Sequence, residues 1–339
     1  MNKDLKIICA QPDDDYYIWQ THVWLESLKE KGLSDKAISL VFTPSYREFN
    51  PKWKQIEKLY PEAEFFFYKD VDKIGQLIGI YIPVLRPYIL MKYFEIHPEL
   101  KNKAVFYCDC DIVFTKDFNI NKYIDDDVSY VSNTLSYINA SYFDSKIKDV
   151  LPEKLEEYKQ RDILEETCKL VGISREIAER NNEHSGGAQY LLKNIDSEFW
   201  KKVLTDCIRI RTYLQKVNKE FFENENKGFQ SWCADMWAVL WNLWLREQKV
   251  KIVPEMNFAW SSDNISKLEN TGILHNAGIV APLQGEIPVF YKGIYCTGKS
   301  PFTDPHLETV RNDERSKTLC NYHYLTKLLE IKKQYNLTY

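Results

Sequence analysis

The sequence predicts an α/β protein whose mostly parallel sheet is flanked by helices and interrupted by a helical insertion. Three observations predict this class. Short apolar segments typical of buried strands recur at residues 5–10, 37–42 and 64–68. A segment with helical spacing, residues 17–31, separates the first two, and strands that alternate with helices form parallel sheets. The 339 residues are also 44% hydrophobic, which is enough for a large core.

The first elements form a β-α-β opening. Leu5 to Ala10 (LKIICA) is a strand, and the polar, acidic turn QPDDD follows it. A helix from Tyr17 to Lys31 comes next, because apolar residues recur at helical spacing and Gly32 suits a C-terminal cap. Ala37 to Phe42 (AISLVF) and Glu64 to Tyr68 (EFFFY) are the second and third strands.

The next pair of elements leads to the most informative segment of the chain. Ile82 to His97 is predicted to be a helix whose start is marked by Pro83 or Pro87. The strand Val105 to Phe114, with the sequence VFYCDCDIVF, follows it. Ligands of such sheets bind beyond the carboxyl ends of the strands, so residues at the end of this strand are candidates for a site.

The second half of the chain is predicted to be more helical. We expect a single domain made of a first half (1–118), a charged helical insertion or lid (144–182), a second half (183–300), and a C-terminal tail (301–339). Within the second half, residues 199–217 and 232–249 have helical patterns, and VKIVPEM is a short strand. The tryptophans of 232–249 favour core packing over sugar stacking.

Charge and cysteine usage exclude several classes. The formal net charge is -4, so the chain has no overall basic field of the kind that attracts nucleic acid or anionic lipid. We expect a cytoplasmic protein without membrane partners, because no apolar segment suits a signal peptide or a membrane span. The eight cysteines show no disulfide framework and are expected to be reduced. The oligomeric state stays open.

Two carboxylates interrupt the apolar segment 105–114. If the segment is one strand, Asp109 and Asp111 share a face while Cys110 points away. Adjacent carboxylates repel unless a cation lies between them, and oxygen ligands favour Mg²⁺ or Mn²⁺. Alternatively, the strand simply ends and both acids lie in a solvated turn. Zinc on Cys108 and Cys110 is not favoured, because no second Cys/His pair completes such a site.

Together with three later segments, this D-x-D motif resembles the nucleotide-sugar glycosyltransferases of the GT-A fold. The later segments are SGGAQYLLK, WCADMWAVLWNLW and GILHNAGI, in that chain order. The resemblance spans about Leu5 to Tyr295, and it implies that residues 1–118 form the nucleotide-binding half and residues 183–300 the half that binds donor sugar and acceptor. It is greatest to hydroxyproline O-arabinosyltransferase-like and serine galactosyltransferase-like enzymes, and to related proteins of viruses and phages.

The resemblance implies roles for particular residues. It places Mn²⁺ (or Mg²⁺) on Asp109, Asp111 and His275, with Asp109 also facing the donor. It implies that Gln189 and Asp235 act on the donor sugar as catalytic-site residues. The implied donor-binding residues are Ala10, Gln11, Arg86, Asp109, Gly186, Gly187, Lys292 and Lys299.

The residues by themselves leave alternatives open. Gly186 and Gly187 can simply make a turn, and Gln189 can bond to backbone. Asp235 needs a partner, which could be a sugar hydroxyl, an arginine or a helix N-terminus. A lone histidine such as His275 is usually structural.

A competing motif lies near the end of the chain. Gly293 to Ser300 (GIYCTGKS) matches the phosphate-binding loop pattern, but Pro301 and Pro305 follow at once and few residues remain. A nucleotide hydrolase is therefore the least favoured function. Lys292 or Lys299 can instead replace the diphosphate-binding lysine of related enzymes, because Ala281 stands where that lysine is expected.

The expected function is metal-dependent transfer of a sugar from a nucleotide diphosphate donor to an acceptor hydroxyl, with retention of configuration. The expected donor is a UDP-sugar carrying arabinose, glucose or galactose. The acceptor is a hydroxymethylated base of phage DNA, a protein hydroxyl or a glycan, and a viral or phage enzyme would act in the host cytoplasm. The alternative is a non-catalytic module that binds nucleotide sugars or glycans.

Overall fold

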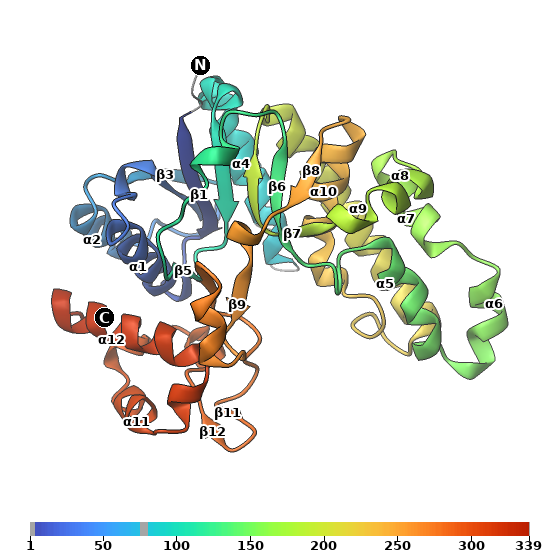
Figure 1. The fold of residues 1–339 in the computed structure, drawn as a ribbon. Coiled ribbons are helices and arrows are strands. Elements are labelled where there is room, and N and C mark those ends of the chain that lie inside the picture. Colours follow the sequence, from blue (N-terminus) through green and yellow to red (C-terminus); the bar gives the residue numbers. More distant parts are fainter. Residues whose placement is uncertain (1–3, 75–80, 339) are drawn as a thin grey trace. The chain divides into compact units, whose positions relative to one another are not determined.

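A seven-stranded sheet organises the computed structural model, which describes residues 4–74 and 81–338. Its strand order is β3-β2-β1-β4-β7-β6-β8 (Figure 1). The strands are β1 (Leu5–Pro12), β2 (Ala37–Thr43), β3 (Glu64–Lys69), β4 (Ala104–Cys108), β6 (Ser129–Asn133), β7 (Gly186–Leu192) and β8 (Val250–Ile252). Strand β2 runs parallel to β1 and β3, and β6 runs parallel to β8 and antiparallel to β7. The predicted α/β class with a mostly parallel sheet is confirmed.

The chain forms two compact units. Unit 1 comprises residues 1–5, 73–106 and 123–253, and unit 2 comprises residues 6–72, 107–122 and 254–339. Strand β4 contributes residues to both units.

Unit 2 contains the β-α-β opening and the end of the chain. Its helices are α1 (Asp15–Lys29), α2 (Lys52–Leu59), α11 (His306–Asn312) and α12 (Asn321–Tyr335). A three-stranded sheet has the order β5 (Ile112–Phe114), β10 (Ile273–His275) and β9 (Phe258–Trp260), and β11 (Leu283–Gln284) pairs with β12 (Ile287–Pro288). Trp19 and Val23 of α1 share one buried cluster with Leu325 and Leu328 of α12. The C-terminal segment is therefore part of the core of unit 2.

The acidic segment after β1 is not only a polar turn. Asp13 is fully buried, and its carboxylate accepts hydrogen bonds from Thr43 Oγ1 (2.8 Å), the Asn50 amide (3.0 Å) and Trp53 Nε1 (2.8 Å). Asp14 caps α1 by accepting from the Tyr16 amide at 3.0 Å. These two acids thus have structural partners within unit 2.

Unit 1 combines β4, β7, β6 and β8 with a largely helical remainder. Helix α4 (Leu85–Ile96) packs against α9 (Ser197–Phe221), which also packs against α10 (Ala234–Leu245). The predicted insertion consists of α5 (Ala140–Ser145), α6 (Leu155–Lys159), α7 (Ile163–Val171) and α8 (Arg175–Arg180), the green helices of Figure 1. Trp237 and Trp241 of α10 are buried, as predicted for core residues.

The predicted strand 105–114 is in fact two strands. Strand β4 ends at Cys108, the residues from Asp109 to Asp111 form a turn, and β5 begins at Ile112 in the other sheet. The prediction that Asp109 and Asp111 share a face by strand alternation is therefore wrong, because the ladder stops before them.

Across the described residues, no helix is both long enough and apolar enough to span a membrane.

His22 makes the stability of the fold depend on pH. Its ring is buried against Tyr60, Phe302 and Tyr335. Among the described residues, neither ring nitrogen has a hydrogen-bond partner. Burial lowers the pKa of His22 to about 4 from its ordinary 6.5, despite the opposing charge of Glu26.

Between pH 6.5 and 4, the unfolded chain therefore binds a proton that the folded chain excludes, and stability falls as the pH falls. We predict that His22→Phe removes up to about 1.4 kcal/mol per pH unit of this slope. Urea unfolding across this pH range measures it. His306→Phe, at an exposed position, is the control, and equal slopes for wild type and His22→Phe would contradict the prediction.

Candidate functional site

Three potential metal ligands converge in unit 2. Asp109, Asp111 and His275 each offer one ligand atom, and these atoms lie within 4.8 Å of one another. His275 Nε2 is 3.6 Å from Asp109 Oδ2 and 3.3 Å from Asp111 Oδ1. The three residues predicted from sequence are therefore brought together, across more than 160 positions of the chain in the case of His275.

Strand pairing accounts for this convergence. Strand β10 is antiparallel to β5, and His275 is directly opposite Ile112, the residue after Asp111. The Asn276 amide donates a hydrogen bond to the Asp111 carbonyl at 2.9 Å, which holds the two segments in register. The Trp260 ring stacks on the His275 ring, with centroids 5.3 Å apart and planes at 25°. Backbone and ring packing thus orient the imidazole toward the carboxylates.

Lys292 places a positive charge beside Asp111. Its ammonium pairs with Asp111 Oδ2, the oxygen that does not face His275. Burial by itself raises the pKa of the Asp111 carboxyl, but the charges of Lys292 and His275 outweigh it and hold the pKa well below its ordinary value. Burial lowers the pKa of Lys292, whereas Asp111 raises it more, so the net shift is upward. Asp111 is therefore ionised and Lys292 is charged at neutral pH.

The donor set fits a divalent cation. Two carboxylate oxygens and one imidazole nitrogen suit Mn²⁺, and a site with three protein ligands leaves positions for water or phosphate oxygens. Asp111 Oδ1 faces His275 while Oδ2 faces Lys292, so the two oxygens of one carboxylate contact different partners.

The remaining predicted donor-binding residues of unit 2, Ala10, Gln11 and Lys299, differ in burial. Ala10 and Gln11 are buried in the last residues of β1. Gln11 Nε2 donates to Ser39 Oγ at 2.6 Å, and its Oε1 has no hydrogen-bond partner among the described residues. Lys299 is exposed.

The competing motif lacks the context of a phosphate-binding loop. Within Gly293 to Ser300, the only regular structure is the end of a 3₁₀ turn, Lys292–Tyr295, and the next element is the 3₁₀ turn Pro301–Thr303. A phosphate-binding loop requires a strand before it and an α-helix after it. The alternative of a nucleotide hydrolase is therefore not supported.

In unit 1, the predicted donor-binding residue Arg86 pairs with the predicted catalytic-site residue Asp235. Arg86 Nη2 on α4 lies 3.2 Å from Asp235 Oδ2 in the first turn of α10. Tyr81 Oη donates to the Trp232 carbonyl at 2.7 Å and lies 3.5 Å from Asp235 Oδ1. An arginine, one of the alternatives left open for Asp235, is thus its partner. Tyr81 was missed, because no local pattern links it to residue 235.

Gly186, Gly187 and Gln189 lie in β7 and not in a turn. A Cβ at Gly186 would be 2.3 Å from the Ser132 carbonyl oxygen, so this glycine permits close approach of β6 and β7. Gln189 Oε1 accepts a hydrogen bond from Ser132 Oγ at 2.6 Å. Ala188 between them has a φ of 69°, which L-residues rarely adopt, beside the irregular pairing of β6 with β7.

Comparison with known proteins gives likenesses in structure only. No protein-family model matches the sequence, and no curated protein matches it. The WbbM bifunctional glycosyltransferase (apo) aligns with 98% of this chain at 11% identity and a TM-score of 0.46. This chain covers 52% of that protein, or about half its length.

Two further structures are similar. The galactosyltransferase LgtC, in complex with donor and acceptor sugar analogues, aligns over 83% of this chain and 90% of its own at 12% identity, with a TM-score of 0.43. Mouse xyloside xylosyltransferase 1 (apo) aligns over 81% of this chain and 98% of its own at 8% identity, with a TM-score of 0.37. All three proteins are glycosyltransferases. A likeness of this degree leaves the function of this chain to be argued from its own residues.

The Arg86–Asp235 pair should contribute strongly to the stability of unit 1. Asp235 is buried, so removing the arginine withdraws a positive charge from beside its carboxylate. We predict that Arg86→Met costs about 3 kcal/mol in unfolding free energy, and that adding Asp235→Asn restores part of it. A double-mutant cycle by urea unfolding measures the coupling.

The exposed pair Lys154–Glu157 is the matched control. Lys154→Met should leave the unfolding free energy nearly unchanged, because water and salt screen an exposed pair. Additive effects of Arg86→Met and Asp235→Asn would mean that the two side chains do not stabilise each other.

Proposed function

We propose that this chain is a metal-dependent glycosyltransferase that moves a sugar from a nucleotide diphosphate, a UDP-sugar, to an acceptor hydroxyl. The observation that carries the proposal is the convergence of Asp109, Asp111 and His275, with Lys292 on the second oxygen of Asp111. A leaving diphosphate develops negative charge, and a cation site beside a buried ammonium is suited to stabilise it.

The residues of the chain have distinct roles in this proposal. Asp109, Asp111 and His275 would hold Mn²⁺ or Mg²⁺, and the bound ion would act as a Lewis acid on the diphosphate. Asp111 positions the Lys292 ammonium next to the same phosphate oxygens. Trp260 and the Asn276 amide keep His275 and Asp111 in place, so little reorganisation is needed when the donor binds.

Lys292 is a better candidate than Lys299 for the diphosphate contact. Its ammonium is already beside Asp111, whereas Lys299 is exposed. A lysine contact to phosphate acts as a point charge, so its distance from the metal ligands determines its effect.

The finer assignments stay predictions. They are the contacts of Ala10 and Gln11 with the nucleotide base, those of Arg86, Gly186 and Gly187 with the donor, and the sugar-orienting roles of Gln189 and Asp235. Retention of configuration, the sugar (arabinose, glucose or galactose) and the acceptor (modified DNA, protein or glycan) belong to the same group. A non-catalytic binding module is the alternative function.

Asp111→Asn tests the metal-dependent reaction. The substitution keeps the shape of the side chain but removes the charge that both the cation and Lys292 require. We expect release of UDP from a panel of UDP-sugars to need Mn²⁺, to stop with EDTA, and to fall on the order of 100-fold or more in the variant. Calorimetry should show weaker Mn²⁺ binding in parallel.

Asp117→Asn is the matched control, because the Asp117 side chain is fully exposed in the same unit. An unchanged rate of UDP release by Asp111→Asn, with Mn²⁺ present, would contradict the proposal. UDP-sugar binding by the wild type without any release of UDP would instead favour the binding module.

A lysine pair tests the diphosphate contact separately. Lys292→Ala should lower the rate of UDP release by about 100-fold, because it removes a charge beside the leaving group. Lys299→Ala should leave the rate unchanged. The reverse result would move the diphosphate contact to residue 299.

A further inference from the structure

A pocket of about 610 Å³ opens within the helical insertion of unit 1. Its volume lies in the ~300–1,000 Å³ range of small-molecule sites. Ile147, which is 41% exposed, and the largely buried Tyr158 line it with apolar groups, and Asp144, Gln160 and Arg175 line it with polar groups. None of its lining residues is among those assigned to donor or metal binding.

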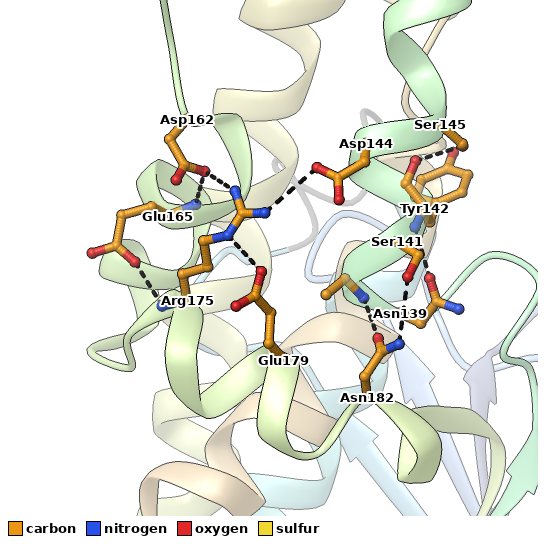
Figure 2. A network of polar contacts seen from close by, with 11 residues as sticks. Asn139, Ser141, Tyr142, Asp144, Ser145, Asp162, Glu165, Arg175, Glu179 and Asn182 are labelled. Atoms are coloured by element: carbon orange, nitrogen blue, oxygen red, sulfur yellow. Dashed lines mark hydrogen bonds and ion pairs between the residues drawn. The ribbon is translucent and has the colours of Figure 1, made fainter.

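The charge of Arg175 is neutralised by its neighbours. Its Nε donates to Glu179 Oε1 at 2.7 Å and its Nη1 to Asp162 Oδ1 at 3.0 Å, while Nη2 is 3.6 Å from Asp144 Oδ1. Figure 2 shows the guanidinium among these three carboxylates, which belong to α5, α8 and the N-cap of α7.

The other two cations of the pocket are also paired. Arg161 bonds to Glu166 through Nε and Nη2 and to Glu220 through Nη1. Lys159 Nζ bonds to Glu156 at 2.7 Å. With every lining cation opposed by a carboxylate, the pocket lacks the positive field that selects phosphate or nucleic acid.

The same groups keep hydrogen-bonding capacity. The distance of 3.6 Å from Arg175 Nη2 to Asp144 is too long for a hydrogen bond, so these N–H groups can donate to a ligand. Asp162 Oδ2 and the side-chain amide of Gln160 have no hydrogen-bond partner among the described residues, whereas the Gln160 backbone N–H donates to the Glu157 carbonyl. The pocket therefore offers several donors and acceptors, and the carboxylates around it outnumber its three cations.

The wall that carries these groups is held in place before any ligand binds. Asn139 caps α5 by accepting from the Tyr142 amide at 2.7 Å, and Asn182 Oδ1 accepts from the Ala140 amide at 2.7 Å (Figure 2). Asp162 caps α7 through the Glu165 amide at 2.9 Å. Preorganised partners reduce the entropic cost of binding.

We propose that this pocket binds a neutral saccharide, the glycan part of the acceptor. A sugar ring has an apolar C–H face and an edge of hydroxyls that both donate and accept. Ile147 and Tyr158 match the face. The amide, carboxylate and guanidinium groups match the hydroxyls. The acceptor role rests on the proposed function, whereas saccharide binding does not.

Ligand-detected NMR on the full chain tests this site. The probes are methyl galactoside, methyl glucoside, methyl arabinoside, lactose and maltose, in EDTA and without nucleotide sugar. We expect at least one probe to bind, with an affinity that does not change between low and high salt. Gln160→Ala and Asp144→Ala should each weaken it by about tenfold. Glu153→Ala, exposed and outside the pocket, is the control and should bind like the wild type.

Absence of binding by all probes, or equal binding in the pocket variants, would overturn the proposal. Binding of inorganic phosphate or of a DNA duplex that is lost with the same variants and at high salt would also overturn it, in favour of an anionic ligand. These measurements are made without metal or donor, so a failure of saccharide binding can be told apart from a failure of the glycosyltransferase reaction. In that case saccharide binding would persist while UDP release is absent.

For the acceptor role, transfer to the best-bound saccharide should lose about tenfold in kcat/KM in Gln160→Ala. UDP release in water should not change. Equal transfer efficiency in the variant and the wild type would remove the acceptor role.

Discussion

Repulsion between two neighbouring carboxylates is the constraint on which unit 2 depends. Asp109 and Asp111 lie in a short turn between two buried strands, where like charges need compensation. The pairing of β10 with β5 supplies an imidazole, and the segment after β12 supplies an ammonium. The two carboxylates and the imidazole that this turn brings together fit a site for a divalent cation.

The last part of the chain is essential to this arrangement. Helix α12 shares the core of unit 2 with α1, and the same cluster contains Val113 of β5 and Leu274 of β10. The strands that bring Asp111 and His275 together are thus packed on helices from both ends of the chain. Rigid surroundings of this kind are what preorganised electrostatic stabilisation requires.

In unit 1, the arginines Arg86 and Arg175 are paired with carboxylates. Arg86 and Asp235 neutralise each other, and Arg175 is surrounded by three carboxylates. Such internally compensated groups do not attract ions from a distance, but they fix planar donors and acceptors in defined directions.

Local sequence was sufficient to predict the α/β class and most strands and helices, because periodicity and composition are properties of short segments. The set Asp109, Asp111 and His275 came from the resemblance to a known family, because a lone histidine gives no such signal by itself. It could not predict that 105–114 breaks into β4 and β5, or that Gly186 and Gly187 are strand residues close to β6. Nor could it choose between Lys292 and Lys299, since the Lys292–Asp111 pair joins residues 181 positions apart. Tertiary structure decided these points, because strand pairing and side-chain packing between distant segments determine which groups become neighbours.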